Sequence, residues 1–159
     1  MNRVGIGYDI HQLTEERNLV LGGVAIPHCK GLAAHSDGDV VCHAIMDALL
    51  GAAALPNIGI LFPDNDAQYK DYNSLKLLGE VVVHLADAGF LPVQVDTNII
   101  AERPKLQPYL AEMRQTIART LGIEENCVSL KPRTNEGFGP EGKEEAISAQ
   151  AVVLIYKKA

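Results

Sequence analysis

The stretch AHSDGDVVCHAIMDALLGAAAL, residues 34–55, decides the fold. A helix is predicted to begin near Asp37, where polar residues give way to a long apolar segment. Apolar side chains then recur around a broad part of the helix surface, so we expect this helix to be largely buried. These side chains are Val40, Val41, Ala44, Ile45, Ala48, Leu49 and Ala52.

The segments on either side predict further elements. Upstream, residues 2–9 predict a short strand, and residues 19–26 contain a Gly-Gly pair that indicates a bend or hairpin. Downstream, residues 56–72 are rich in Pro, Gly, Asn and Asp and predict a long loop, which in a compact domain is usually functional or mobile. A second helix is predicted over residues 74–88, and Gly89 ends it.

The rest of the chain predicts a strand over residues 93–99, a helix over 108–121, a short strand over 128–130 and a glycine-rich loop over 134–142. In the last strand one face carries Ile147, Ala149, Ala151, Val153 and Ile155. The order of elements predicts an α+β sandwich in one domain over residues 1–159, with one mixed sheet covered by helices on one side. The second face of the last strand carries Val152, Leu154 and Tyr156, so we expect the uncovered sheet face to meet another subunit.

Composition limits the class of protein. The chain has 159 residues, 47% of them hydrophobic and only 5% aromatic, which predicts an aliphatic core. A net charge of −6 disfavours nucleic acid and anionic membranes as partners. Three scattered cysteines and the lack of a signal-peptide pattern predict a cytoplasmic protein with reduced thiols.

Three side chains of the types that bind metal lie in two separate segments. Asp9 and His11 are two residues apart in a predicted strand, so they point the same way, although such a pair alone is more often a surface pair. His43 lies in an apolar helix, where a neutral core histidine is the commoner arrangement. Asp47 shares its helix face and is expected to hold the imidazole by a hydrogen bond, or else to be a solvated neighbour. Two histidines and one carboxylate together form the ligand set of a catalytic zinc with an open fourth position.

The start of the buried helix is a candidate phosphate site. Ser36 or Asp37 is expected to be the N-cap, with Asp39 in the first turn, and this structural role is the commoner one for both aspartates. The free amides of the helix start, with His35 and Ser36 beside them, can receive a phosphate.

The loop KPRTNE, residues 131–136, is a second candidate. Lys131 and Arg133 supply positive charge, and the following glycines can present backbone amides to an anion. Glu136 can hold a hard cation such as Mg²⁺. A basic glycine-rich loop is more often only a turn, so this signal alone is weak.

Four motifs together resemble one family. GYDIH (residues 7–11), residues 34–55, IGILFPDND (58–66) and KPRTNE (131–136) are similar in order and spacing to the 2-C-methyl-D-erythritol 2,4-cyclodiphosphate synthases. The resemblance covers essentially the whole chain. It implies a homotrimer with active sites between subunits, which converts 4-diphosphocytidyl-2-C-methyl-D-erythritol 2-phosphate to the cyclic 2,4-diphosphate and CMP in the non-mevalonate isoprenoid route.

The resemblance also implies the site residues. Zinc, one per chain, is held by Asp9, His11 and His43, and a second ion, Mg²⁺ or Mn²⁺, by Glu136. His35 and Thr134 stabilise the transition state. Residues 57–59 meet the ribose, 62–66 form a mobile lid, 101–107 hold the cytosine and 133–136 the diphosphate. The implied substrate-binding residues are Asp9, His11, His35, Ser36, Asn57, Ile58, Gly59, Phe62, Pro63, Asp64, Asn65, Asp66, Ala101, Glu102, Arg103, Pro104, Lys105, Leu106, Gln107, Arg133, Thr134, Asn135, Glu136 and Lys143.

The sequence departs from the family pattern in three places, which involve four residues. Asn57 replaces the usual carboxylate at the ribose, and Arg133 stands where a small polar residue is common. Pro140 and Lys143 replace an aromatic residue and an arginine, which predicts weak or no binding of prenyl diphosphates at the trimer axis.

Two other functions stay open from the residues. A zinc phosphoesterase would use the same ligands with a positioned water and release a linear phosphate. A non-catalytic trimeric binding module would carry no stoichiometric zinc.

Overall fold

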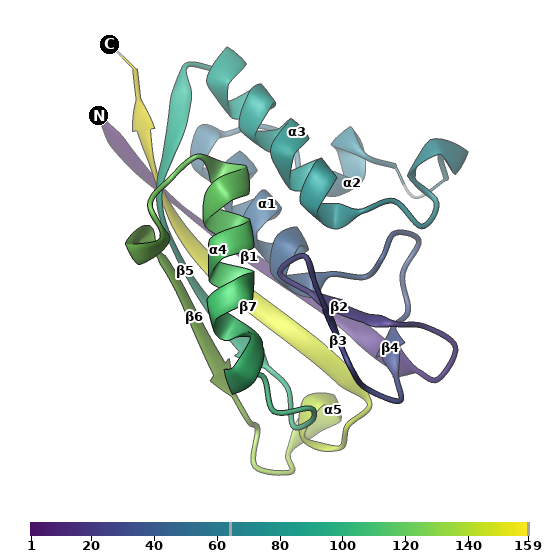
Figure 1. Cartoon of the computed structure of the whole chain (residues 1–159). Helices are drawn as coiled ribbons and strands as arrows, with labels where there is room; N and C mark the ends of the chain where they lie inside the picture. The colour runs from purple at the N-terminus through teal and green to yellow at the C-terminus, as the bar shows by residue number, and fades with distance from the viewer. Residues whose placement is uncertain (64, 159) are drawn as a thin grey trace.

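A five-stranded sheet forms the centre of the computed structural model, which describes residues 1–63 and 65–158 (Figure 1). Its strands are β1 (Asn2–Thr14), β4 (Gly31–Leu32), β5 (Phe90–Ile100), β6 (Val128–Arg133) and β7 (Ala146–Lys157). They lie in the order β4-β1-β7-β5-β6. Only the β5–β6 pair among these neighbours is parallel, so the expected mixed sheet is confirmed. A separate hairpin joins β2 (Leu19–Leu21) to β3 (Val24–Ile26), as the Gly-Gly pair indicated.

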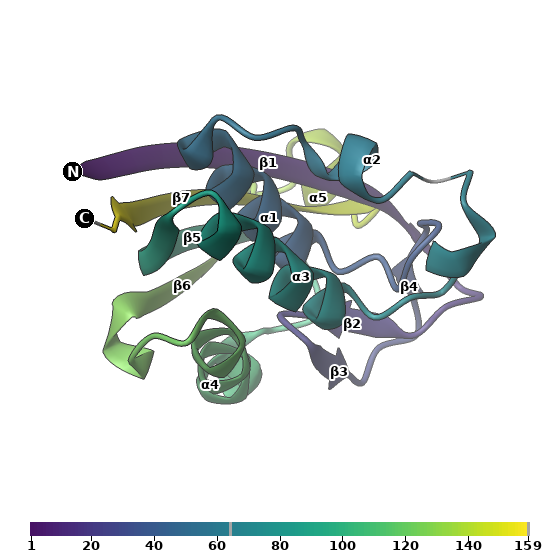
Figure 2. The same cartoon turned by 90° about the horizontal axis from the view of Figure 1, so that it is seen from above.

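Three long helices cover one face of this sheet (Figures 1 and 2). They are α1 (Val40–Ala53), α3 (Ser74–Asp87) and α4 (Leu110–Leu121). α1 packs on β1 and β7, α3 lies beside α1 and β5, and α4 lies beside α3 and β6. The predicted α+β arrangement, with helices on one face, is therefore confirmed. No helix in the described ranges is long and apolar enough to cross a membrane.

α1 is buried as its sequence predicted, with twelve of its side chains in the interior. Its backbone comes very close to β1, because Gly5 and Gly7 face it without side chains. A Cβ atom on Gly7 would lie 2.0 Å from the carbonyl oxygen of Ala44, and one on Gly5 would lie 2.0 Å from that of Ala48. This close approach sets the distance between the strand and the helix, and with it the position of His43.

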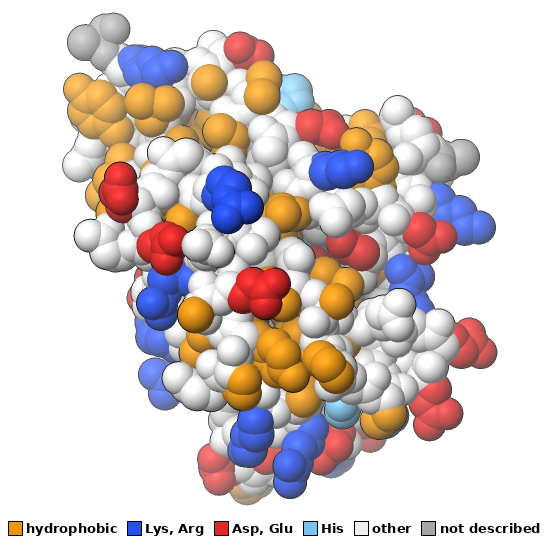
Figure 3. Space-filling model, in the orientation of Figure 1, with side chains coloured by type: hydrophobic (Ala, Val, Ile, Leu, Met, Phe, Trp, Pro, Cys, Tyr) orange, Lys and Arg blue, Asp and Glu red, His pale blue; other side chains and the backbone are white. Residues whose placement is uncertain are grey.

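The other face of the sheet is open and apolar in the isolated chain. Along β1 and β7 the side chains alternate, so that one set meets the helices and the other faces outward. The outward set includes Val4 (67% exposed), Ile6 (64%), Tyr8 (54%), Ile10, Val152 and Tyr156, and Leu91 of β5 is exposed as well. The view in Figure 3 is onto the helix face, where charged and apolar side chains are mixed. The two faces therefore differ in character.

Several expected boundaries differ from the structure. β1 runs to Thr14 rather than ending at residue 9, because it pairs with β7 as far as Gln12 and then with β4 through Leu13 and Thr14. The expected loop over 56–72 contains α2 (Ile58–Leu61) and η1 (Ala67–Tyr69). The expected loop over 134–142 ends in α5 (Gly139–Gly142), and the helix expected from residue 108 begins at Leu110, after η2 (Gln107–Tyr109). η3 (Glu125–Cys127) leads into β6.

Candidate metal centre and substrate site

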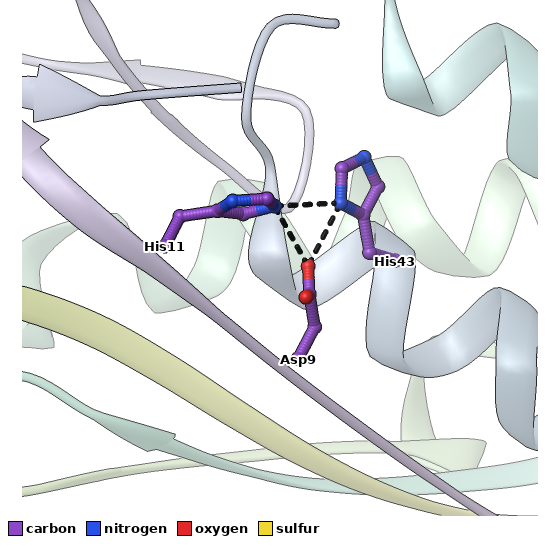
Figure 4. Close-up of side chains that lie close together, drawn as sticks. All are labelled: Asp9, His11 and His43. Atoms are coloured by element: carbon purple, nitrogen blue, oxygen red, sulfur yellow. Dashed lines mark hydrogen bonds and ion pairs between the residues drawn. The ribbon is translucent and has the colours of Figure 1, made fainter. Parts of the chain in front are cut away.

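Asp9, His11 and His43 converge on one point (Figure 4). Asp9 and His11 lie two residues apart on β1 and point toward the helices, and His43 reaches them from the first turn of α1. The Oδ2 atom of Asp9 lies 2.9 Å from His11 Nε2 and 2.8 Å from His43 Nδ1. The two imidazole nitrogens are 3.2 Å apart. Three side chains from two distant segments thus present one ligand atom each to a common centre.

This arrangement fits a tetrahedral metal ion. Zinc bonds of about 2.0–2.2 Å place neighbouring ligand atoms about 3.3 Å apart, close to the separations in this cluster. Two nitrogens and one carboxylate oxygen are also the donor set of catalytic zinc, which keeps a fourth position open. The Oδ1 atom of Asp9 accepts a hydrogen bond from the Ile10 amide, so this carboxylate is held in place from its other side.

The charges of the three groups support one another. Burial raises the pKa of Asp9, but the hydrogen bonds and charges of His11 and His43 outweigh it and hold that pKa well below its usual range. Burial lowers the pKa of His43, but the hydrogen bond and charge of Asp9 more than offset this effect, and the pKa is raised. The carboxylate is therefore ionised and ready to hold a cation.

Asp47 does not hold the His43 imidazole, and the prediction of that role is wrong. Its Oδ1 atom accepts a hydrogen bond from the amide of Ile58 (2.9 Å) and so anchors α2. The far nitrogen of His43, Nε2, instead lies 2.9 Å from Ser74 Oγ and 3.2 Å from Ser36 Oγ. The imidazole ring turns toward β1, whereas Asp47 points to the segment that follows α1.

The N-cap of α1 is Asp39, not Ser36 or Asp37. Its carboxylate accepts hydrogen bonds from the amides of Val41 and Cys42, both at 3.1 Å. The same fully buried group also accepts from Gly22 (2.9 Å) and Gly23 (2.7 Å) of the β2–β3 hairpin. Asp39 therefore joins the hairpin to the helix that carries His43.

A cavity opens beside the metal cluster. His35, Ser36 and His43 form its polar side, and Ile58, Gly59 and Phe62 belong to the segment opposite. His35 Nε2 lies 3.2 Å from the backbone oxygen of Asp66, so this histidine contacts the segment expected to be the lid. Asn57, whose Oδ1 accepts from the Ile60 amide, caps α2. Pro63, Asn65 and Asp66 complete the described part of this segment, and the expected substrate residue Asp64 lies outside the described residues.

A second pocket, of about 270 Å³, lies where β5 and β6 end. It is lined by Ala101, Pro104, Lys105, Leu106, Gln107, Pro132, Arg133 and Thr134. The segment expected to hold cytosine and the loop expected to hold the diphosphate are thus adjacent, joined by a hydrogen bond from the Ala101 amide to the Arg133 carbonyl (2.9 Å). Glu102 and Arg103 belong to the same segment but do not line the pocket.

The loop after β6 has internal hydrogen bonds of its own. The Thr134 hydroxyl donates to the Glu136 carboxylate, and the side-chain Nδ2 of Asn135 donates to the carboxylate of buried Glu141. Lys143 follows α5 and is exposed. Lys131, expected to supply charge to this loop, is bound instead to Asp96 at 2.6 Å.

A family model described as the YgbB family matches residues 2–156. This chain belongs to that family. A relative from Syntrophomonas wolfei, named 2-C-methyl-D-erythritol 2,4-cyclodiphosphate synthase, is 58% identical over 153 residues, which are 96% of this chain and 98% of the relative.

Solved structures from this family have the same fold. The structure described as "IspF (Plasmodium falciparum) CDP complex" has a TM-score of 0.86 at 35% identity and covers 99% of this chain and 97% of its own. The bifunctional IspDF from Campylobacter jejuni has a TM-score of 0.94 at 38% identity; the match covers 99% of this chain but only 42% of that longer protein.

The sequence does not predict that Ser74 and Asp37 adjoin the metal cluster of this YgbB-family chain, on the side of His43 opposite Asp9 and His11. Ser74 is fully buried and contacts His43, and its hydroxyl donates to Asp37. In the sequence Ser74 is the first residue of an ordinary amphipathic helix, and Asp37 is a typical capping residue. No feature of the local sequence around Ser74 or Asp37 indicates a contact between Ser74 and His43, which lies more than thirty residues away in the chain.

Proposed function

We propose that this chain converts 4-diphosphocytidyl-2-C-methyl-D-erythritol 2-phosphate to 2-C-methyl-D-erythritol 2,4-cyclodiphosphate and CMP, a phosphorus–oxygen lyase reaction of the non-mevalonate isoprenoid route. The observation that carries the proposal is the convergence of Asp9, His11 and His43 within 3.2 Å beside the His35 cavity. Membership of the YgbB family and the names of its relatives support the specific reaction.

Asp9, His11 and His43 are proposed to hold one Zn²⁺, and Glu136 a second ion, Mg²⁺ or Mn²⁺. When bound, such ions would neutralise charge on phosphate oxygens and so make the phosphorus more open to attack. This explains how a chain of net charge −6 takes a substrate with three phosphates. The carboxylate of Glu136 lies beside the Thr134 hydroxyl, which donates to it.

The reaction needs no protein nucleophile. An oxygen of the substrate's 2-phosphate forms a bond to the β-phosphorus, the bond from that phosphorus to the bridging oxygen breaks, and CMP leaves with the electron pair. The chain has to fold the substrate so that these atoms meet, and to place hydrogen-bond donors where charge develops. We assign this stabilising role to His35, beside the metal cluster, and to Thr134, in the second pocket.

The two pockets suit different parts of the substrate. The pocket of residues 101–107 and 133–134 is proposed to take the cytosine and the diphosphate; the Plasmodium falciparum relative was solved as a CDP complex. The cavity between His35 and residues 57–62 is proposed to take the methylerythritol and ribose, with residues 62–66 as its lid.

We further propose a homotrimer that shares its active sites. The open sheet face supports this, since it exposes Val4, Ile6, Tyr8, Val152 and Tyr156, which a soluble monomer rarely leaves uncovered in one patch. Two strands, β7 and β5, separate β1 from β6 in the sheet, so neighbouring copies can supply the metal cluster and the cytidine pocket of one site.

Subunit complementation tests the shared site. The variants His43→Ala and Glu136→Ala should each be inactive. When the two variants are unfolded, mixed and refolded together, trimers that contain both chains should recover part of the activity. A monomer in sedimentation, or no recovery from mixed trimers, contradicts the shared site.

Product analysis tests the reaction itself. Phosphorus NMR of the reaction mixture should show a cyclic diphosphate together with CMP. A linear methylerythritol phosphate would identify a phosphoesterase instead, and the absence of any product with zinc present would favour a binding module.

A further inference from the structure

The position of His43 determines which of its two ring nitrogens can bind a metal. Nδ1 faces the cluster, 2.8 Å from Asp9 Oδ2 and 3.2 Å from His11 Nε2. A metal takes the lone pair of the nitrogen that faces it, so Nδ1 must carry no proton in the metal-bound state. In a neutral imidazole the proton is then on Nε2, which points away from the cluster into the protein.

Two serine hydroxyls lie at Nε2, and the Ser74 hydroxyl is oriented to accept. Ser74 Oγ is the nearer, at 2.9 Å, and its own proton is directed to the Asp37 carboxylate at its other side. Because a hydroxyl has one proton, Ser74 is left with lone pairs toward His43. Ser36 Oγ is farther, at 3.2 Å, and lines the cavity.

Asp37 also fixes the position of Ser74. One carboxylate oxygen accepts the Ser74 hydroxyl, and the other accepts the Ser74 backbone amide at 3.0 Å. Ser74 is 0% exposed and stands at the start of α3, whose first turn is capped separately by the Asn73 side chain. The Ser74 hydroxyl is therefore held in one position, excluded from solvent and not needed as a helix cap.

We infer that Ser74, backed by Asp37, is a positioning residue that sets the tautomer and ring orientation of His43 for metal binding. The chain of hydrogen bonds runs from His43 Nε2–H to Ser74 Oγ and from the Ser74 hydroxyl to Asp37. Outer partners of this kind hold a ligating histidine in the correct orientation and raise its basicity, and their loss commonly weakens metal binding about 10–100-fold. This inference rests on the proposed zinc site.

The direct test measures zinc affinity by competition with a chromophoric chelator. Ser74→Ala should bind zinc about 10–100-fold more weakly than the unmutated protein, and Ser74→Thr, which keeps the hydroxyl, should recover most of that affinity. Asp47→Asn is the matched control, since it lies one helical turn from His43 on α1 but contacts Ile58 instead; its zinc affinity should be unchanged. Equal affinity of Ser74→Ala and the unmutated protein overturns the inference, as does a larger loss in Asp47→Asn.

A spectroscopic measurement on the unmutated, zinc-loaded protein needs no variant that might misfold. Long-range ¹H–¹⁵N spectra should show His43 with its proton on Nε2, protected from exchange with solvent, and the signal is assigned by its loss in His43→Ala. In Ser74→Ala this proton should exchange faster with solvent, whereas in Ser74→Thr, which keeps the hydroxyl, it should stay protected. A proton on Nδ1 overturns the inference. If the unmutated protein binds no zinc, the proposed metal centre itself is wrong, and the two failures are thereby distinguished.

Discussion

A methyl group at Gly7 should open the metal cluster without touching any of its ligands. In Gly7→Ala the new Cβ would lie 2.0 Å from the Ala44 carbonyl oxygen, whereas ordinary contacts begin at 3.4 Å, so α1 has to move back by about 1.4 Å. The atoms in the way are helix backbone, which cannot turn aside as a side chain can. A movement along the line from Asp9 Oδ2 to His43 Nδ1 would widen their 2.8 Å separation to at most about 4.2 Å, more than the roughly 3.3 Å that one tetrahedral zinc spans.

Two quantities should change together in Gly7→Ala. Overpacking at this site should cost about 3 kcal/mol of unfolding free energy, the upper end of the usual range, and zinc affinity should fall by more than about 100-fold, beyond the loss of an outer partner. Urea unfolding and chelator competition measure the two effects.

Gly51→Ala is the matched control for that substitution. Gly51 lies on the same helix, and nothing lies within 4 Å of the position that a Cβ atom would take there. This change should therefore leave zinc affinity unchanged and stabilise the helix by about 0.5–1 kcal/mol. Native stability and native zinc affinity in Gly7→Ala would refute the argument that the close approach of β1 and α1 builds the cluster.

Three further predictions concern particular contacts. Asp39→Ala, which removes a charged acceptor from four amides, should lower the unfolding free energy by about 3–5 kcal/mol, and a loss below about 1 kcal/mol in urea unfolding would contradict this. Because the hydrogen bond from Lys131 holds the pKa of Asp96 below its usual value, that pair should stabilise the fold above about pH 4 and lose its effect as the pH falls further. In the single chain the Asp96 and Lys131 side chains are 44% and 41% exposed, and for a pair of that exposure the stability difference between the unmutated protein and Asp96→Asn should be under about 1 kcal/mol. This difference should vanish in acid, whereas a difference independent of pH would exclude the ion pair as its cause. Calorimetric titration with geranyl diphosphate should give a dissociation constant weaker than low micromolar. Lys143 cannot make the two parallel hydrogen bonds that an arginine makes to a phosphate, and Pro140 offers no aromatic ring for the prenyl chain. Tighter binding would show that these two residues do not prevent prenyl diphosphates from binding at the proposed trimer axis.

The sequence predicted the elements whose pattern is set by burial. The alternation of Ile147, Ala149, Ala151, Val153 and Ile155 placed one face of β7 in the core, and all five are buried. The apolar spacing of α3 and the glycine after it gave that helix its bounds to within one residue. Burial of a regular element leaves a periodic trace in the sequence, so such elements can be found without tertiary information.

Features that depend on distant contacts could not be predicted in this way. Asp37 and Asp39 are equally suitable caps locally, and Asp39 is the cap in the structure because its carboxylate also meets the Gly22 and Gly23 amides. Helical spacing predicts Asp47 as a partner of His43, yet the partner of Asp47 in the structure is the amide of Ile58, eleven residues on. The contact between His43 and Ser74 also joins residues far apart in the chain, so no local pattern in the sequence predicts it.

The cluster of Asp9, His11 and His43 is proposed to support a metal-dependent release of CMP, and one assay addresses that proposal. The purified protein is incubated with 4-diphosphocytidyl-2-C-methyl-D-erythritol 2-phosphate, and CMP is followed by chromatography, with and without a strong chelator, and after zinc and magnesium are returned. We expect CMP and cyclic diphosphate in equal amounts, loss of both with chelator, recovery with the ions, and no recovery in His43→Ala. CMP release that persists in full in the metal-free protein or in His43→Ala would contradict the proposed metal centre.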